Sequence, residues 1–259
     1  MRIGWWVGVL LGGLGCCLAA RAQPLHLYTE EYPPLNFSRD GEATGFATEV
    51  VREILRGTGQ SASIEVATWA RGYKQTQTRA DTGLFVTMRT REREALFKWV
   101  GPLTSNITHF YGLKTSTLQL RNLDDARAAS AIGVPRDWYS QQLLRREGFT
   151  NLYPLVGPEQ MVRMLKLGRV ELIAVDDLSL AALLAKGELR REDVRPLLAF
   201  VRTYSYIAFS PLTDDALVQR WQSELDRIKA DGRFAGLYRH WLPGHALPGA
   251  GAGGEQLLP

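Results

Sequence analysis

Cysteine is almost absent from this chain: only two of its 259 residues are cysteines, Cys16 and Cys17, which are adjacent in an apolar N-terminal stretch. This excludes a cysteine-based zinc site, an iron–sulfur cluster and a disulfide framework elsewhere in the chain. Excess charge is also small, because the formal net charge is +4 and the basic residues are spread along the sequence. Nucleic acid is therefore not expected as a partner, since neutralising phosphates requires a concentrated basic face.

Sequence motifs for metal binding and catalysis are scarce as well. The sequence has no glycine-rich phosphate loop, no GxSxG elbow and no HExxH. None of the histidines has a metal-ligand spacing with a nearby acid; they are His26, His109, His240 and His245. We therefore expect no metal, no cofactor and no catalytic residues. With 45% hydrophobic and 22% charged residues, the composition is that of a globular protein rather than a disordered one.

The N-terminus has the pattern of an export signal. Arg2 precedes an apolar run over residues 3–20, and small residues stand three and one positions before a cleavage point after Ala22. A signal peptide over residues 1–22 and a periplasmic location are therefore expected. A retained membrane anchor is the alternative, but the run contains five glycines and is barely long enough to span a bilayer. Lipid attachment at one of the two cysteines is a further alternative.

Apolar spacing alternates between that of helices and that of strands. The apolar residues within 46–55 recur at helical spacing, so a helix is expected between Gly45 and Gly59. Residues 172–175 are a short apolar run that predicts a buried strand. Alternating strands and helices indicate an α/β fold, although periodicity leaves open whether there is one sheet or two. Residues 244–259 are rich in Gly, Ala and Pro, and we expect a disordered tail there.

Several short motifs, taken in their order along residues 25–242, carry a family resemblance. The chain resembles the bacterial extracellular solute-binding proteins of family 3, the amino-acid-type periplasmic binding proteins. The motifs are 30–37 (EEYPPLNF), 45–46 (GF), 69–73 (WARGY), 89–94 (RTRERE), 97–102 (FKWVGP), 123–125 (LDD), 132–134 (IGV), 168–171 (GRVE) and 229–232 (KADG). The segment at 89–94 is the most specific of them.

This resemblance implies a two-lobed periplasmic-binding-protein fold of type II, in which two sheets flanked by helices are joined by two crossover strands. Lobe 1 would comprise residues 24–111 and 204–243, and lobe 2 residues 112–203. The crossings would fall near 111–112 and 202–203. The resemblance further implies a monomer that binds a small-molecule solute in the cleft between its lobes and hands it to the membrane permease of an ABC transporter. Closure about a hinge can bury a small polar solute in such a cleft.

The resemblance also suggests roles for four side chains. Arg93 would clamp a ligand carboxylate with two parallel hydrogen bonds, and its alternative in this charged segment is a solvated surface arginine. Asp176 would receive a ligand ammonium group, and its alternative role is to cap the helix that follows. Tyr32 and Trp69 would pack flat against the ligand, with core packing as the alternative.

The chain departs from the family pattern at two places. Met88 and Arg89 stand where a small hydroxyl residue is common, and residues 135–139 are bulky, with Tyr139 as their only hydroxyl group. Arg71 and Arg89 would add positive charge near the cleft. The expected ligand is a small amino-acid-like or carboxylate solute, with Tyr139, Arg71 and Arg89 among the residues that would contact it. The departures leave open whether an α-amino acid fits, and the added positive charge would suit a more acidic or differently shaped solute.

Two other functions use the same fold class. A periplasmic dehydratase would need a carboxylate as general acid, and Glu30, Glu31 or Asp176 are the candidates. A ligand sensor would report occupancy to a membrane receptor through a partner protein.

Overall fold

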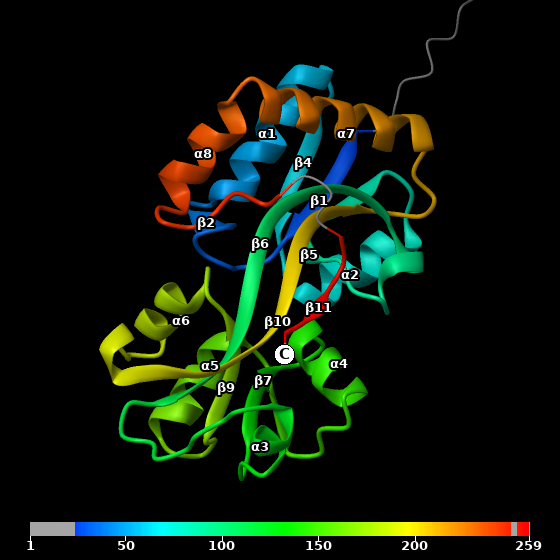
Figure 1. Ribbon diagram of the computed structural model, residues 1–259. Helices are drawn as coiled ribbons and strands as arrows, with labels where there is room; N and C mark the ends of the chain where they lie inside the picture. The colour runs from blue at the N-terminus through cyan, green and yellow to red at the C-terminus, as the bar shows by residue number, and fades with distance from the viewer. Residues whose placement is uncertain (1–23, 250–252, 259) are drawn as a thin grey trace, which may run out of the picture.

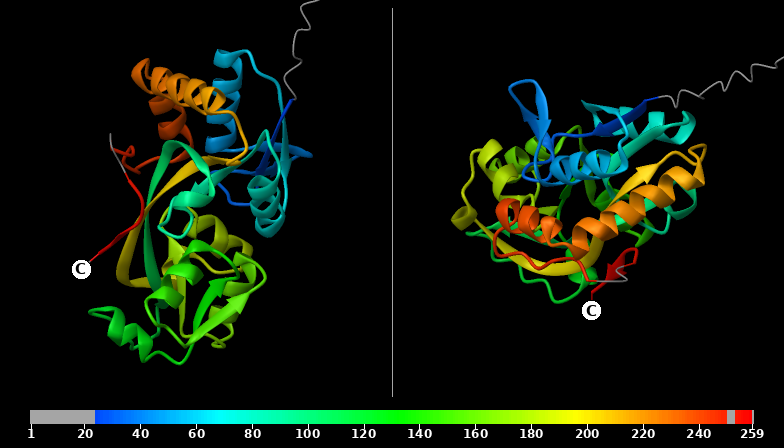
Figure 2. Two further views of the ribbon diagram at one scale, coloured as in Figure 1. Left: turned by 90° about the vertical axis from the view of Figure 1, so that its right-hand side faces the viewer. Right: turned by 90° about the horizontal axis from the view of Figure 1, so that it is seen from above.

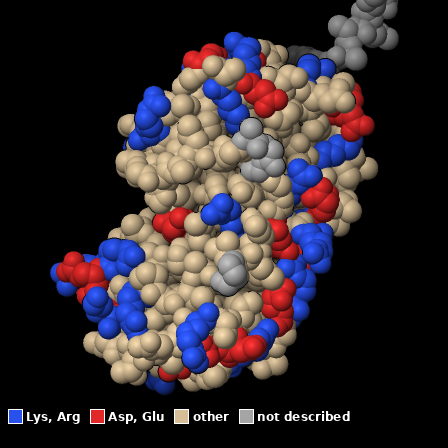
Figure 3. Space-filling model, viewed as in Figure 1, with Lys and Arg blue, Asp and Glu red and all other residues tan. Residues whose placement is uncertain are grey.

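The computed structural model describes residues 24–249 and 253–258 as two lobes joined by two long strands (Figure 1). The expected signal peptide, residues 1–22, lies outside the described residues. Within the described part of the chain, no helix has the length and apolar character needed to cross a membrane. On the face in Figure 3, basic and acidic side chains are interspersed.

The first lobe is formed by the beginning and the end of the described chain, and the second lobe by the part between them. The first lobe contains β1 (Leu25–Thr29), β2 (Phe37–Arg39), β3 (Glu42–Thr44), α1 (Phe46–Thr58), β4 (Ala62–Val66), α2 (Trp69–Thr78), β5 (Thr82–Met88), the 3₁₀ turn η1 (Glu94–Leu96), α7 (Asp215–Ala230) and α8 (Arg233–Trp241). The second lobe contains α3 (Leu123–Arg127), β7 (Ile132–Pro135), α4 (Tyr139–Arg146), β8 (Leu152–Leu155), α5 (Pro158–Lys166), β9 (Leu172–Asp176), α6 (Leu180–Lys186) and η2 (Arg191–Asp193). The two lobes share β6 (Lys98–Leu113) and β10 (Val194–Phe209).

The predicted α/β class is confirmed, with parallel strands at the outer part of each lobe. The strand order is β4-β1-β5-β10-β6-β9-β7-β8; β1 is parallel to β4 and β5, and β7 is parallel to β8 and β9. The two expected crossovers are β6 and β10, each 16 residues long, which pair with each other antiparallel along their whole length. Backbone hydrogen bonding therefore runs continuously from one lobe's sheet into the other.

The crossing on β6 lies earlier in the chain than we expected. Residues 108–111 pair with β9, and Phe110 is buried in the core of the second lobe, so these residues do not belong to lobe 1. The unbroken 16-residue strand gives no sequence signal of where the lobe changes. On β10, Phe200 packs in the second lobe whereas Ser205 pairs with β5, so the return crossing lies between them.

The cores follow from the apolar faces of the helices. In the first lobe α1 and α7 pack on each other, and Phe46, Ile54 and Trp221 are fully buried between them and the strands. Each such side chain contributes roughly 1.5–3 kcal/mol through burial. Figure 2 shows α1, α7 and α8 gathered at the end of the first lobe that is far from the second. Trp138 and Tyr139, from the second lobe, join the same buried cluster, so apolar contact continues across the cleft.

The predicted helix after Gly45 is confirmed as α1, and its ends have a clear cause. Gly45 has φ 109° and ψ 172°, a conformation that is nearly confined to glycine. Gly59, in the left-handed conformation with φ 66°, ends the helix and donates its N–H to the last turn. The strand predicted at 172–175 is confirmed as β9.

The expectation of a disordered tail over 244–259 is wrong for the described residues. β11 (Gln256–Leu257) pairs antiparallel with β10 (Figure 1), and the Glu255 carboxylate pairs with Arg146 of α4 at 2.5 Å. The cause is an open edge: β5 pairs with β10 only over residues 205–209, which leaves the backbone groups nearer the second lobe unpaired on that side. A backbone ladder needs no apolar side chains, so composition could not reveal it.

Candidate functional site

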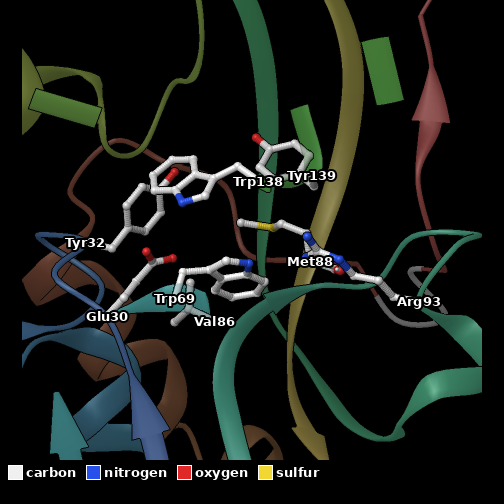
Figure 4. A pocket seen from close by; sticks show the side chains of 8 residues that line it. All are labelled: Glu30, Tyr32, Trp69, Val86, Met88, Arg93, Trp138 and Tyr139. Carbon is white, nitrogen blue, oxygen red and sulfur yellow. Dashed lines mark hydrogen bonds between the residues drawn. The ribbon is translucent and has the colours of Figure 1, made fainter. Parts of the chain in front are cut away.

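A narrow pocket lies where strands of both lobes end (Figure 4). Its lining residues are Glu30, Tyr32, Trp69, Val86, Met88 and Arg93 from the first lobe and Trp138 and Tyr139 from the second. They lie at or just after the ends of β1, β4, β5 and β7, and the carboxyl ends of parallel strands are where open α/β sheets place their ligands. The free volume of ≈ 20 Å³ is about the room of one water molecule, so the two lobes are closed on each other here.

Arg93 is buried at the boundary between the lobes, 1% exposed. Its guanidinium donates to the Gln142 side chain at 3.1 Å and to the Asp137 carbonyl at 3.4 Å, both in the second lobe. The Trp69 and Tyr73 rings lie 4.8 and 5.4 Å from its central carbon. The surface alternative for Arg93 therefore does not hold.

The charge of Arg93 is not balanced by an adjacent carboxylate. Among the described residues no acid lies within ion-pairing distance of it, and its Nε has no hydrogen-bond partner. A buried cation without a counter-ion is costly, because both its hydration and its pairing energy are lost. Such a group favours the arrival of an anion that can accept two hydrogen bonds.

Helix α4 presents its N-terminus to the same place. Its cap residue, Trp138, provides no side-chain acceptor, and the first turn contains no acid. Gln142, which binds Arg93, also donates its backbone N–H to the Trp138 carbonyl. The N–H groups of the first turn and the positive end of the helix dipole add to the attraction of Arg93 for an anion.

Asp176 has the helix-start role, which was its alternative in the sequence, and it also contacts the first lobe. Its Oδ1 accepts the backbone N–H groups of Leu178 and Ser179 at 3.1 and 3.0 Å, as a residue at a helix start does. Its Oδ2 accepts the Ser179 hydroxyl at 2.9 Å and, across the cleft, the hydroxyl of Tyr32. Burial raises the pKa of Asp176 to about 6, and neighbouring Asp177 adds to the rise. The structure thus brings Asp176 to Tyr32 and not to the lining of the pocket.

The predicted aromatic residues do line the pocket. Tyr32 meets the Trp138 ring edge to face at 5.2 Å, and Figure 4 shows Trp69 and Trp138 on opposite sides of the space. The Tyr139 hydroxyl is bound to that of Thr108 at 2.8 Å, and burial raises the pKa of Tyr139 to about 12. Tyr139 therefore remains a neutral hydroxyl group at any physiological pH.

The two additional arginines lie outside this pocket. Arg71 is largely exposed, pairs with Glu65 at 2.9 Å and lines a wider outer opening of the cleft. Arg89 is directed away: its Nε pairs with Glu94 at 2.7 Å and its guanidinium lies over the Tyr206 ring. The expectation for Arg89 is therefore wrong, because residues next to each other at a strand end point to opposite sides, and Met88 takes the pocket side.

Four lining residues are not assigned to the ligand site by the sequence: Glu30, Val86, Met88 and Trp138. Glu30 was considered only as a candidate acid for catalysis, although it follows the first strand directly. Val86 has φ 62°, which is rare for a β-branched residue, and it lies where the pairing of β5 with β10 shifts register. No sequence pattern reveals that bulge.

Among the described residues there is also no cluster of three or more potential metal ligands.

Glu30 is the acid on the pocket wall, and its proton affinity is strongly shifted. Burial raises the pKa of Glu30 from 4.5 to about 8, although Arg93 and a hydrogen bond from Trp138 act in the opposite direction. At neutral pH the carboxyl group is mostly protonated, which leaves Arg93 as the dominant charge in the pocket.

This shift predicts a pH dependence of stability that Glu30→Gln removes. Between pH 4.5 and 8 the folded protein holds a proton that the unfolded chain has lost, so the free energy of unfolding falls as pH rises through this window. The slope approaches about 1.4 kcal/mol per pH unit and vanishes above the folded pKa. Urea unfolding at pH 5 to 9 should show the wild type losing stability relative to Glu30→Gln up to pH 8. Glu31→Gln, at the exposed neighbouring position, is the control, and parallel curves for Glu30→Gln and wild type would contradict the shift.

The chain is similar to one protein family and to several solved structures. The model of the bacterial extracellular solute-binding proteins, family 3, matches residues 26–244. Curated protein sequences give no match. A histidine kinase sensor domain with similarity to periplasmic binding proteins is 18% identical with a TM-score of 0.79, covering 87% of this chain and 98% of that one.

Two further solved structures have the same fold. The arginine-, lysine-, histidine-binding protein ArtJ from Geobacillus stearothermophilus is 14% identical with a TM-score of 0.74, covering 86% of this chain and 97% of its own. An ancestral amino acid-binding protein, a precursor of cyclohexadienyl dehydratase, is 18% identical with a TM-score of 0.69, covering 84% and 94%. These likenesses confirm the predicted two-lobed fold of type II periplasmic binding proteins.

Proposed function

The chain belongs to family 3 of the bacterial extracellular solute-binding proteins, and we propose that it captures a small carboxylate or amino-acid-like solute between its lobes and passes it to the permease of an ABC importer. The observation that carries the proposal is Arg93: a buried guanidinium at the lobe boundary with no carboxylate partner among the described residues. The ligand carboxylate takes the place of the missing counter-ion.

Binding and lobe closure use the same contacts. Arg93 belongs to the first lobe, while its acceptors Asp137 and Gln142 belong to the second. An anion held between Arg93 and the start of α4 therefore attracts the lobes to each other. The pocket in this form has room for about one water molecule, so the solute enters only when the lobes separate, and the lobes then close around it at a wider spacing. The closed form then presents a distinct surface to the permease.

The role of Tyr32 and Trp138 in this scheme is to exclude water. Their rings meet across the cleft at 5.2 Å, and both are almost fully buried. A dry environment strengthens the pairing of the ligand carboxylate with Arg93.

Export by the N-terminal segment and a monomeric state belong to the same proposal.

A thermal-shift screen of α-amino acids, polyamines and small carboxylic acids tests this function. A ligand at one hundred times its Kd stabilises the folded state by about 2.7 kcal/mol, which for a chain of this size raises Tm by roughly 5–10 °C. We expect such a shift with at least one acid, 1:1 stoichiometry in calorimetry, and recovery of the acid unchanged after long incubation. Stabilisation by polyamines alone would contradict the proposal, and conversion of the acid would identify a dehydratase-type enzyme instead.

A further inference from the structure

Asp176, which sequence reasoning assigned to a ligand ammonium group, has its acceptor capacity filled by the protein itself. Oδ1 receives two backbone N–H groups from the turn before α6, at 3.1 and 3.0 Å. Oδ2 receives the hydroxyl groups of Ser179 and Tyr32. The carboxylate is 1% exposed, so an ammonium group would reach it only by displacing Tyr32.

Glu30, the other acid at this place, is also not free to receive a cation. It interacts with Trp138 and with the positive charge of Arg93, and its raised pKa keeps it mostly neutral at pH 7. A second cation placed beside it would be repelled by Arg93, which has no carboxylate of its own within pairing distance among the described residues. The charge in the pocket is therefore balanced by a single negative group on the solute.

The rest of the wall is apolar or aromatic. Trp69 and Trp138 lie on opposite sides of the space, the end of the Met88 side chain projects between them, and Val86 lies beside Trp69 (Figure 4). Flat rings and thioether groups pack well against aromatic or branched aliphatic bodies. They offer no acceptor to a charged side chain.

We propose that the preferred solute is a monocarboxylic acid with an apolar or aromatic body and no ammonium group on its α-carbon. The inference rests on the proposed function and names its substrate class. The carboxylate binds Arg93 and the first turn of α4, and the body lies between Trp69 and Trp138. The Tyr32–Asp176 contact breaks when the lobes separate to admit the acid, and it forms again beside the bound acid when they close.

Calorimetry on matched pairs tests the proposal with the full-length protein. The pairs are phenylalanine with 3-phenylpropanoate and leucine with 4-methylpentanoate, which differ only by the α-ammonium group. We expect the acid without the ammonium group to bind at least tenfold more tightly in at least one pair. Tighter binding of the amino acids would overturn the inference while leaving the proposed function intact. Binding of no acid in these pairs or in the wider screen would defeat the proposed function itself.

The variant Tyr32→Phe probes the cause of the selectivity. It keeps the ring but removes the hydroxyl that occupies Oδ2 of Asp176, so this oxygen becomes available to an ammonium group. We expect the preference within each pair to fall at least threefold, mainly through better binding of the amino acid. If both members of a pair weaken equally, Tyr32 is only structural, and the explanation of selectivity through Asp176 is overturned.

Discussion

Arg93→Ala should lose binding of the preferred acid by roughly thirtyfold or more. Removing one partner of a buried charge pair costs about 2–5 kcal/mol, and every 1.4 kcal/mol is a factor of about ten in Kd. Arg93 is 1% exposed and supplies the dominant positive charge to the pocket, so no other lining side chain can replace it. Calorimetry with the acid that gives the largest thermal shift measures the loss directly.

Two further variants make the Arg93 result interpretable. Arg93→Lys keeps the charge but loses the planar fork, so it should recover only part of the affinity. Arg89→Ala is the matched control, because Arg89 lies only four residues earlier and points away from the pocket toward Glu94 and Tyr206. Its Kd should stay within threefold of wild type. An Arg93→Ala protein that folds normally and binds the acid as well as wild type would refute the clamp.

The burial of Arg93 shows where sequence reasoning stops. Residues 89–94 carry five charges in six positions, a pattern typical of a solvated segment. Arg89 and Glu94 do pair with each other at the surface. Arg93 is instead covered by Trp69 and by the second lobe, whose contacting residues are more than 40 positions away. Only the family resemblance singled it out, and its ligand role remains a prediction.

The fold itself was more accessible to the sequence. The helix α1 is set by local causes, namely its apolar spacing and the glycines at its two ends. The strand β9 is set by its continuous apolar run. The position of β11 is not local, because it depends on β10 having an unpaired edge. The same holds for the Tyr32–Asp176 contact, which joins residues 144 positions apart.

Gly45→Ala should destabilise the protein more than any other glycine substitution in the loop that carries Tyr32. A Cβ at Gly45 would lie 2.6 Å from the Leu35 carbonyl oxygen and 2.8 Å from that of Pro34, and these are backbone atoms. The same two carbonyls accept the first N–H groups of α1, at 2.8 and 3.1 Å. Backbone strain and weakening of these hydrogen bonds together cost about 3 kcal/mol.

Gly45→Ala should also affect the pocket, because the loop over residues 30–36 packs against Gly45 and determines where Tyr32 lies. Leu35 donates its N–H to the Tyr32 carbonyl at 3.0 Å, so a shift of Leu35 moves the ring that faces Trp138. We expect a lower Tm, by roughly 6–12 °C, and weaker binding of the preferred acid in the same variant. Urea unfolding and calorimetry on one preparation measure both effects.

Gly41→Ala separates the two causes of the Gly45 effect. Gly41 has φ 81° and nothing within 4 Å of its added Cβ, so alanine there meets backbone strain without a collision. The cost of a left-handed residue alone is about 1–2 kcal/mol. Gly45→Ala should exceed it by at least 1 kcal/mol and should alone reduce ligand affinity. Equal destabilisation by the two substitutions would mean that residues 34–35 move away from the added Cβ without an energetic cost. The start of α1 would then not hold Tyr32 in position.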